Sequence, residues 1–145
     1  MKILYGVQGT GNGHLSRARV MAKAMQKQGV DVDFFFSGRS AEQFFDMQCF
    51  GQYRVQSGLT FATHNGRVNV AQTAKMNAWL GFVKDVKNLD LSSYDLVLND
   101  YEPVSAWAAK NQGIPSIGIS HQAALNFAVP KAGDSWFNET MLNYF

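Results

Sequence analysis

The order of apolar runs, glycines and helical repeats along the chain predicts strands that alternate with helices. Residues 2–7 form a short apolar run that is typical of a buried strand. Apolar positions recur at helical spacing from Leu15, and Gly29 predicts the end of that helix, because a residue without Cβ takes a positive φ at low cost. Residues 30–37 hold three consecutive phenylalanines and predict a second strand. The N-terminal part of the sequence therefore has a β–α–β pattern.

The middle of the chain is less regular. Residues 40–43 have the Ser-x-x-Gln spacing of a capping box, which predicts a helix that ends near Gly51. Residues 65–66 are an Asn-Gly pair, which favours the tight turn of a β-hairpin. Residues 71–88 carry aromatic and β-branched positions at helical spacing and predict a further helix.

The remaining elements complete the alternation. Residues 96–98 predict a buried strand, Pro103 fits the first turn of the helix that follows, and Gly113 predicts its end. Residues 116–120 predict one more strand. Strands separated by helices imply right-handed crossovers, and these imply a parallel sheet. We therefore expect an α/β fold: a Rossmann-like, doubly wound parallel sheet with helices on both faces.

Length and composition limit the class of protein. A chain of 145 residues suits a single domain, here residues 1–145. Its hydrophobic content of 46% and charged content of 17% exclude a disordered chain. A formal net charge of +2 is too small to indicate nucleic-acid binding, so no nucleic-acid partner is expected.

The cysteine and histidine content limits which disulfides and metal sites the chain can form. Cys49 is the single cysteine, so no intrachain disulfide is possible and a reducing compartment is favoured. The chain starts without the pattern of a signal peptide and contains no apolar stretch long enough to span a membrane, which predicts a cytoplasmic protein. His14, His64, His121 and Cys49 lack the short paired spacings of a zinc site, so no metal is expected.

Polar clusters follow four of the predicted strands, at residues 9–14, 37–39, 99–102 and 120–122. Parallel strands end at the same edge of a sheet, and ligands bind beyond that edge. We therefore expect all four clusters to face one crevice.

The glycine-rich loop at residues 6–14 allows three interpretations. A Walker A loop requires lysine after its second glycine, and Asn12 after Gly11 excludes it. A dinucleotide loop remains open, although His14 replaces its third glycine, because Arg39 could meet the extra phosphate of NADP. The third interpretation is a loop that presents His14 at the mouth of a helix, where the positive end of the helix dipole favours an anion.

Residues 9–18, Gly-Thr-Gly-Asn-Gly-His-Leu-Ser-Arg-Ala, resemble the first loop and helix of GT-B glycosyltransferases. The similarity is greatest to MurG-like members of glycosyltransferase family 28. Residues 100–103 and 119–122 extend the resemblance, which covers essentially the whole chain as an N-terminal domain. It implies one half of a GT-B fold: the acceptor side of an enzyme that moves a sugar from a nucleotide diphosphate sugar to a hydroxyl acceptor. The donor-binding C-terminal domain is absent from this chain, so the chain alone is expected to be inactive and to need no cofactor of its own.

The resemblance also implies roles for individual residues. His14 would be the general base that removes the proton of the acceptor hydroxyl, and Asp100 would hold its other ring nitrogen. The alternatives are a histidine that only hydrogen-bonds its loop and an aspartate that only caps a helix. Glu102 precedes Pro103 and is equally a helix-start residue. The residues expected to contact the acceptor are Gly9, Thr10, Gly11, Asn12, Gly13, Arg17, Glu102 and His121.

The partners expected from the sequence are a sugar or lipid-linked acceptor and the missing C-terminal domain. Residues 134–145 are rich in aromatic side chains, which fits a last helix folded back on the domain, a chain that continues, or self-association into a homo-oligomer. Lys75, Lys84 and Lys87 in the predicted helix at residues 71–88 could attract the anionic lipid of a membrane's inner face, and an ordinary solvated helix is the alternative.

Overall fold

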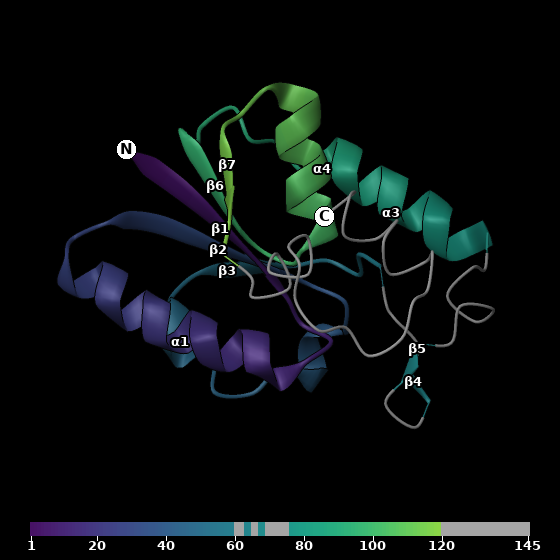
Figure 1. The fold of residues 1–145 in the computed structure, drawn as a ribbon, viewed down its shortest axis with the longest axis horizontal. Coiled ribbons are helices and arrows are strands. Elements are labelled where there is room, and N and C mark those ends of the chain that lie inside the picture. Colours follow the sequence, from purple (N-terminus) through teal and green to yellow (C-terminus); the bar gives the residue numbers. More distant parts are fainter. Residues whose placement is uncertain (60–62, 65–66, 69–75, 120–145) are drawn as a thin grey trace, which may run out of the picture.

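A computed structural model describes residues 1–59, 63–64, 67–68 and 76–119 of the chain. Five parallel strands form one sheet in the order β3-β2-β1-β6-β7 (Figure 1). The order changes direction at β1, because β2 and β6 pair with its two sides. The strands are β1 (Lys2–Gln8), β2 (Asp31–Ser37), β3 (Tyr53–Val55), β6 (Leu96–Asp100) and β7 (Ser116–Gly118).

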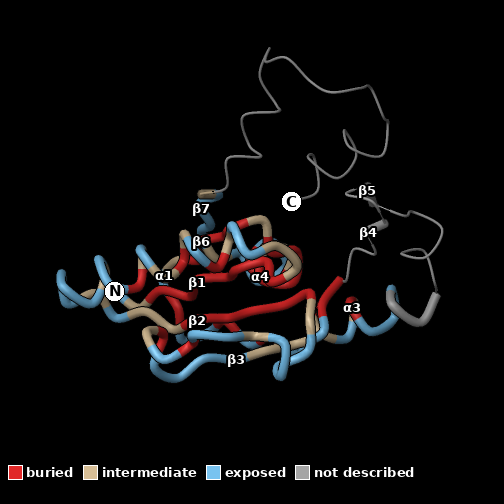
Figure 2. The backbone as a smooth tube through the Cα atoms, turned by 90° about the horizontal axis from the view of Figure 1, so that it is seen from below, coloured by how far each residue is buried: buried red, intermediate tan, exposed pale blue. Residues whose placement is uncertain are grey.

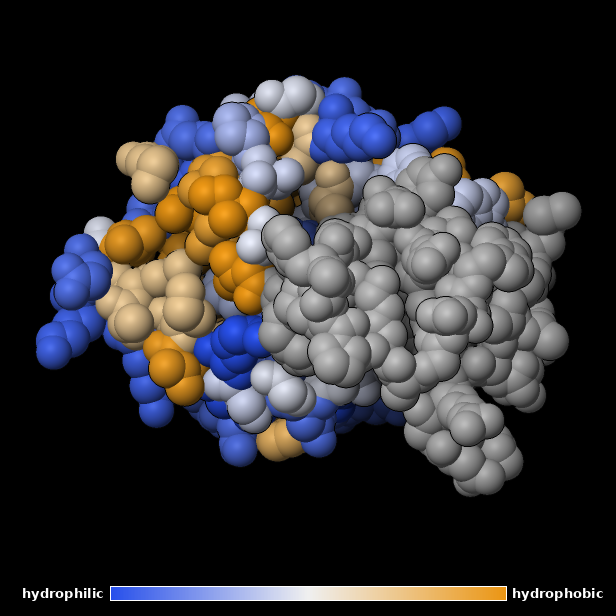
Figure 3. Space-filling view, in the orientation of Figure 1, coloured by the Kyte–Doolittle hydropathy of each residue, from blue (hydrophilic) through white to orange (hydrophobic). Residues whose placement is uncertain are grey.

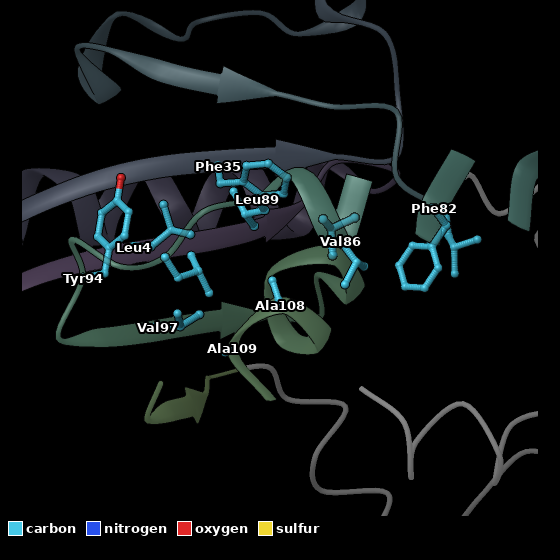
Figure 4. Close-up of a cluster of buried hydrophobic side chains, with 12 residues drawn as sticks. Leu4, Phe35, Phe82, Val86, Leu89, Tyr94, Val97, Ala108 and Ala109 are labelled. Carbon is cyan, nitrogen blue, oxygen red and sulfur yellow. The ribbon is translucent and has the colours of Figure 1, made fainter. Parts of the chain in front are cut away.

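Alternation along the strands divides the core into two layers. On β1, Ile3, Tyr5 and Val7 pack toward α1 (Asn12–Lys27), while Leu4 packs toward the opposite face. That opposite face is covered by α3 (Met76–Asn88) and α4 (Pro103–Gln112), whose buried side chains join Leu4, Phe35 and Val97 (Figure 4).

Figure 2 shows that the buried backbone runs along the middle of the sheet, between the layers. The expected Rossmann-like fold, with helices on both faces of a parallel sheet, is therefore confirmed.

Several predicted helix ends are confirmed by their backbone geometry. Gly29 follows α1 with a φ of +67°, and Gly113 ends α4 with a φ of +69° in the left-handed region. Pro103 is the first residue of α4, where the missing N–H costs nothing. These three residues mark the boundaries that the sequence assigned to them.

The prediction of a helix directly after β2 is wrong. Two short 3₁₀ turns, η1 (Ala41–Gln43) and η2 (Gln48–Phe50), stand in its place, although the predicted capping box is present at the first of them. Asp46 between them has a left-handed φ of +52°. The bend brings the ring of Phe44 against Phe36 of β2, at 5.4 Å between ring centroids, so aromatic packing overrides the local helical signal.

The hairpin expected in the middle of the chain is present as two short antiparallel strands, β4 (Thr63–His64) and β5 (Arg67–Val68). Residues 65–66, where its turn was expected, lie outside the described residues, as do residues 71–75 at the expected start of α3.

Apolar surface is visible between α1 and the side of the sheet that ends at the edge strand β7 (Figure 3). Ile117 of β7, for example, is 52% exposed. The polar residues that the sequence indicates as site candidates lie at a different place, at the carboxyl ends of the strands.

Candidate functional site

The carboxyl ends of β1, β2 and β6 lie side by side, because these three strands are parallel neighbours. This arrangement brings together three of the four polar clusters that the sequence placed at strand ends, residues 9–14, 37–39 and 99–102. The fourth cluster, residues 120–122 with His121, lies outside the described residues.

His14 and Asp100 are in direct contact. His14 lies in the first turn of α1, and Asp100 is the last residue of β6, which pairs with β1. Nδ1 of His14 is 2.7 Å from Oδ1 of Asp100. The Asp100 side chain is wholly buried, whereas the His14 side chain keeps 12% of its surface exposed. A buried carboxylate therefore holds an imidazole that reaches the surface.

Arg17 completes this cluster from the same helix. Its Nε donates to Oδ2 of Asp100 and its Nη2 donates to Oδ1, each at 2.7 Å. The same Nη2 lies 3.2 Å from Nδ1 of His14. Arg17 stands three positions after His14, so both side chains leave the same face of α1. Oδ1 of Asp100 is thus shared between the imidazole and the guanidinium, and the pairing of Arg17 with Asp100 is bidentate.

The electrostatics of the cluster favour an ionised aspartate. Burial alone would raise the pKa of Asp100, but its hydrogen bonds with His14 and Arg17 and the electrostatic attraction of these two groups outweigh burial and hold the pKa of Asp100 below its usual value. Burial raises the pKa of Tyr5 on β1 well above its usual range, and the nearby Asp100 carboxylate raises it further. At neutral pH the carboxylate is therefore charged and its phenolic neighbour is not.

Tyr101 sits beside the histidine in a backbone conformation that is unusual for its residue type. Its φ is +57°, in the left-handed region. Its ring is nearly parallel to the ring of His14, at an interplanar angle of 7° and a centroid distance of 6.2 Å. Burial raises the pKa of Tyr101. A strained residue that flanks a histidine–aspartate pair is typical of a functional site.

Glu102 has a different role from Asp100. Its side chain is wholly buried at the N-cap of α4, where it accepts hydrogen bonds from the backbone N–H groups of Val104 and Ser105, at 2.8 Å and 2.6 Å. Ser37 Oγ donates a third bond at 2.6 Å. Burial raises the pKa of Glu102, and the hydrogen bonds from Ser37, Ser105 and Val104 oppose that rise without cancelling it. Helix capping, the alternative that the sequence left open for Glu102, accounts for these contacts.

A family model described as glycosyl transferase family 1 matches residues 1–142. The chain belongs to this glycosyltransferase family. An uncharacterized glycosyltransferase from Methanosarcina acetivorans is 26% identical over 137 residues, which cover 92% of this chain and 35% of that relative. The chain therefore spans about a third of the length of the curated relative it matches.

A solved structure supports the same assignment at the level of the fold. MurG from Acinetobacter baumannii matches with a TM-score of 0.52 at 21% identity, over 99% of this chain and 39% of MurG. The resemblance to the N-terminal domain of GT-B glycosyltransferases, which the sequence motifs indicated, is thereby confirmed.

A network of polar side chains from β1 and β2 contacts the start of the loop between β1 and α1. Ser37 Oγ lies 3.3 Å from Oε1 of Gln8, and Nε2 of Gln8 donates to Thr10 Oγ1 at 3.0 Å. A Cβ on Gly6 would come within 2.0 Å of Ser105 Oγ, so only glycine allows β1 to approach α4 this closely. The same network that caps α4 therefore also positions the start of the loop.

Arg39 stabilises the same loop by hydrogen bonds to two of its residues, Gly9 and Asn12. It donates to the carbonyl oxygen of Gly9, to Oδ1 of Asn12 at 3.0 Å and to the carbonyl oxygen of Gln43 at 3.3 Å. Partial burial lowers the pKa of Arg39. Because these donors are directed at the chain itself, no observation favours the NADP-binding alternative, which needed Arg39 for a phosphate.

The glycines of the loop differ in what surrounds them. A Cβ on Gly9 would meet the ring of Phe44 at 2.6 Å, whereas a Cβ on Gly13 would meet nothing within 4 Å. Gly11 is the N-cap of α1 and supplies no side-chain hydrogen bond to the helix. The first turn of α1 carries no acidic residue. The loop therefore presents main chain at the positive end of a helix.

Metal and membrane signals are absent from the described parts of this glycosyltransferase-family chain. Across residues 1–59, 63–64, 67–68 and 76–119, no group of three or more His, Cys, Asp or Glu side chains is arranged to hold a metal ion. None of the helices in this part of the chain is long and apolar enough to cross a membrane.

Sequence reasoning missed several residues that build the site. Arg17 was expected to contact an anionic acceptor, and its pairing with Asp100 was not foreseen, although the three-residue spacing from His14 indicates a shared helix face. Tyr101 carries no signal in the sequence beyond its place after a strand. The capping network consists of four buried polar residues, Gln8, Ser37, Asn99 and Ser105. The signal that the sequence offered for them was a polar residue at the end of each neighbouring predicted strand and in the first turn of the helix that begins at Pro103.

Proposed function

We propose that this chain is the acceptor side of a glycosyltransferase that moves a sugar from a nucleotide diphosphate sugar to a hydroxyl acceptor. Membership of the glycosyltransferase family supports the reaction class. The observation that carries the residue assignment is the 2.7 Å contact between Nδ1 of His14 and the wholly buried Asp100 carboxylate.

The proposed chemistry is general base catalysis. The acceptor oxygen forms a bond to the anomeric carbon, the nucleoside diphosphate leaves with the electrons of the broken bond, and the hydroxyl proton passes to Nε2 of His14. Asp100 accepts a hydrogen bond from Nδ1–H, orients the ring and stabilises the imidazolium that forms. His14 is the catalytic residue in this scheme, and Asp100 is its positioning residue.

The remaining contacts of the proposal lie around the loop. Main-chain groups of Gly9, Thr10, Gly11, Asn12 and Gly13 would line the pocket for a sugar or lipid-linked acceptor. His121 stays a proposed contact. We propose that the donor is a UDP-sugar that binds a separate C-terminal domain, that the chain alone is inactive, and that the protein acts in the cytoplasm or at the inner face of a membrane.

Calorimetry tests the division between acceptor and donor sides. UDP-glucose and UDP-N-acetylglucosamine titrated into residues 1–145 should give no dissociation constant in the micromolar range. A micromolar constant for either compound would contradict the assignment of this chain to the acceptor side.

The base is tested in the protein that carries this chain together with a donor-binding half. Nucleoside diphosphate release is measured with a panel of UDP-sugars and hydroxyl acceptors. His14→Asn should lower kcat by about 10²–10⁴-fold with little change in the acceptor KM, which is the usual contribution of a general base. Lys23→Gln, on the exposed side of the same helix, is the matched control and should leave the rate unchanged. A His14→Asn rate close to that of the control contradicts the proposal.

A further inference from the structure

Arg17 lies between the two residues of the proposed catalytic pair. We infer that Arg17 is a positioning residue that balances the charge of Asp100 and keeps the imidazole of His14 in its unprotonated, proton-accepting form. This inference rests on the proposed function, because it assigns a role to Arg17 within the same transfer site. It differs from the role expected from the sequence, in which Arg17 contacts an anionic acceptor.

The hydrogen-bond geometry determines which ring nitrogen carries the proton. Nδ1 of His14 and Nη2 of Arg17 both lie 2.7 Å from Oδ1 of Asp100. A guanidinium only donates and an ionised carboxylate only accepts. An unprotonated Nδ1 would therefore place two acceptors 2.7 Å apart. The contact requires hydrogen on Nδ1, so in the neutral ring Nε2 is the accepting nitrogen.

The charge of Arg17 opposes protonation of that ring. A carboxylate that faced the imidazole alone would stabilise its protonated form, and a protonated ring cannot take a proton from an acceptor. Arg17 neutralises the same carboxylate through two bonds and places a positive group 3.2 Å from Nδ1. With a neutral imidazole the three groups sum to zero charge, and with a protonated imidazole they sum to +1. The arrangement thus favours the form that a general base needs.

Two tyrosines are the other titratable groups described beside this cluster. From the loop after β6, Tyr101 faces the imidazole, and from β1, Tyr5 lies near the Asp100 carboxylate. Burial raises the pKa of both tyrosines, so both are uncharged at neutral pH. Asp100 comes from β6 and Arg17 from α1. Arg17 supplies two hydrogen bonds to the Asp100 carboxylate from a permanently charged group.

Histidine NMR on the whole chain tests the inference without a substrate. The chain is labelled with ¹⁵N-histidine, and His14→Gln identifies the signals of this ring. Arg17→Gln should raise the pH at which the ring is half protonated by about one unit or more, the usual effect of one neighbouring charge. Arg17→Lys keeps the charge but not the two-bond pairing, so its shift should have the same sign and be smaller. Arg19→Gln removes a cation from the same helix that is directed at the carbonyl groups of Phe45 and Asp46, and it should cause no shift.

Two results separate the inference from the proposed function. A ring in Arg17→Gln that titrates at the wild-type pH, or at a lower pH, overturns the role of Arg17 and leaves the base assignment standing. A wild-type neutral ring with its hydrogen on Nε2 overturns the base assignment itself. If Arg17→Gln does not fold, Arg17→Met, which also removes the charge, takes its place, and an unshifted ring in that variant counts against the inference.

The pH profile of sugar transfer adds a readout that a purely structural role would not move. In the protein with both halves, Arg17→Gln should shift the acidic limb of kcat/KM to higher pH, and the rate should recover toward wild type at alkaline pH. A higher acceptor KM with an unshifted limb would instead support acceptor binding by Arg17 and overturn the inference. A loss of rate that is equal at every pH would overturn it as well.

Discussion

Asp100 and Glu102 are both wholly buried and stand only two positions apart, yet they serve different purposes. Asp100 faces a histidine and an arginine, which keep its pKa low. Among the described residues, Glu102 accepts hydrogen bonds from the backbone N–H groups of Val104 and Ser105 and from the Ser37 hydroxyl, and burial raises its pKa. Burial alone therefore does not set the charge of a carboxylate, because the groups around it decide in which direction its pKa moves.

The backbone between the two carboxylates directs them to opposite sides of the sheet. Residues two apart on a continuing strand would share one face. β6 ends at Asp100, and the left-handed φ of +57° at Tyr101 reverses the chain. Asp100 consequently faces α1, while Glu102 turns toward α4. One residue thus separates the candidate site from the helix cap.

Removing the Glu102 carboxylate should have the largest effect on stability. Glu102→Ala leaves two backbone N–H groups and the Ser37 hydroxyl without their acceptor in a buried place. We expect the free energy of unfolding in urea to fall by about 4 kcal/mol, from several unsatisfied donors and a lost cap. Glu102→Gln keeps one acceptor oxygen and should lose about half as much. A loss below about 1 kcal/mol for Glu102→Ala would contradict the capping role.

The next largest effects are expected from two glycine-to-alanine changes, one on each side of the sheet, which should change the free energy of unfolding in opposite directions. Gly6→Ala would place a Cβ 2.0 Å from Ser105 Oγ, beside the cap, and should cost about 2–3 kcal/mol through overpacking. Gly13→Ala, on the His14 side, meets nothing within 4 Å and lies in the first turn of α1. It should raise the free energy of unfolding by about 0.5–1 kcal/mol, because alanine favours a helix. Urea unfolding of both variants checks the contrast, which would fail if the two changes had the same sign.

The elements of this fold were predictable because local signals and tertiary packing agree at most positions. Gly29, Pro103 and Gly113 mark helix ends by backbone chemistry that does not depend on neighbours. The failure after β2 has the opposite cause. The capping box there is real, but aromatic contacts such as Phe44 against Phe36 hold the chain in a bend that no local pattern reveals.

The candidate site was predictable in its location and less so in its contacts. Parallel strand ends place His14 and Asp100 at one edge, and the structure brings them into contact. The direction of each side chain beyond a strand end depends on single backbone angles. The left-handed Tyr101 sends Glu102 away from the loop, which a sequence pattern of Asp-x-Glu does not indicate. The target of Arg17 was missed because it belongs to a strand 83 positions away.

The pH dependence of stability should differ in sign between the two carboxylates. The lowered pKa of Asp100 gives stability that is present above the unfolded-state pKa, and this stability is lost as the pH falls below about 4. The raised pKa of Glu102 gives the opposite sign, because folding favours its protonated form, which is lost as the pH rises through the folded-state value.

Urea unfolding between about pH 3 and pH 7 measures both contributions. Relative to wild type, Asp100→Asn should flatten the loss of stability on the acid side. Glu102→Gln should remove the opposing gain, so its stability should decline more steeply toward low pH. Parallel curves for the two variants would show that both carboxylates have equivalent surroundings, against the contacts described above.

The smallest expected change in the free energy of unfolding concerns Tyr101, in the turn between the two carboxylates. Tyr101→Gly and Tyr101→Ala both remove the ring that lies parallel to His14, so the difference between them reports the backbone alone. Because an L-residue at a φ of +57° is strained and glycine is not, the glycine variant should be more stable by about 1 kcal/mol in urea unfolding. Gly113→Ala, at a φ of +69° with nothing within 4 Å of an added Cβ, is the reciprocal control and should lose a similar amount. Equal stability of the glycine and alanine variants would mean that the chain leaves β6 without strain. Some feature other than this turn would then have to direct Asp100 and Glu102 to opposite faces.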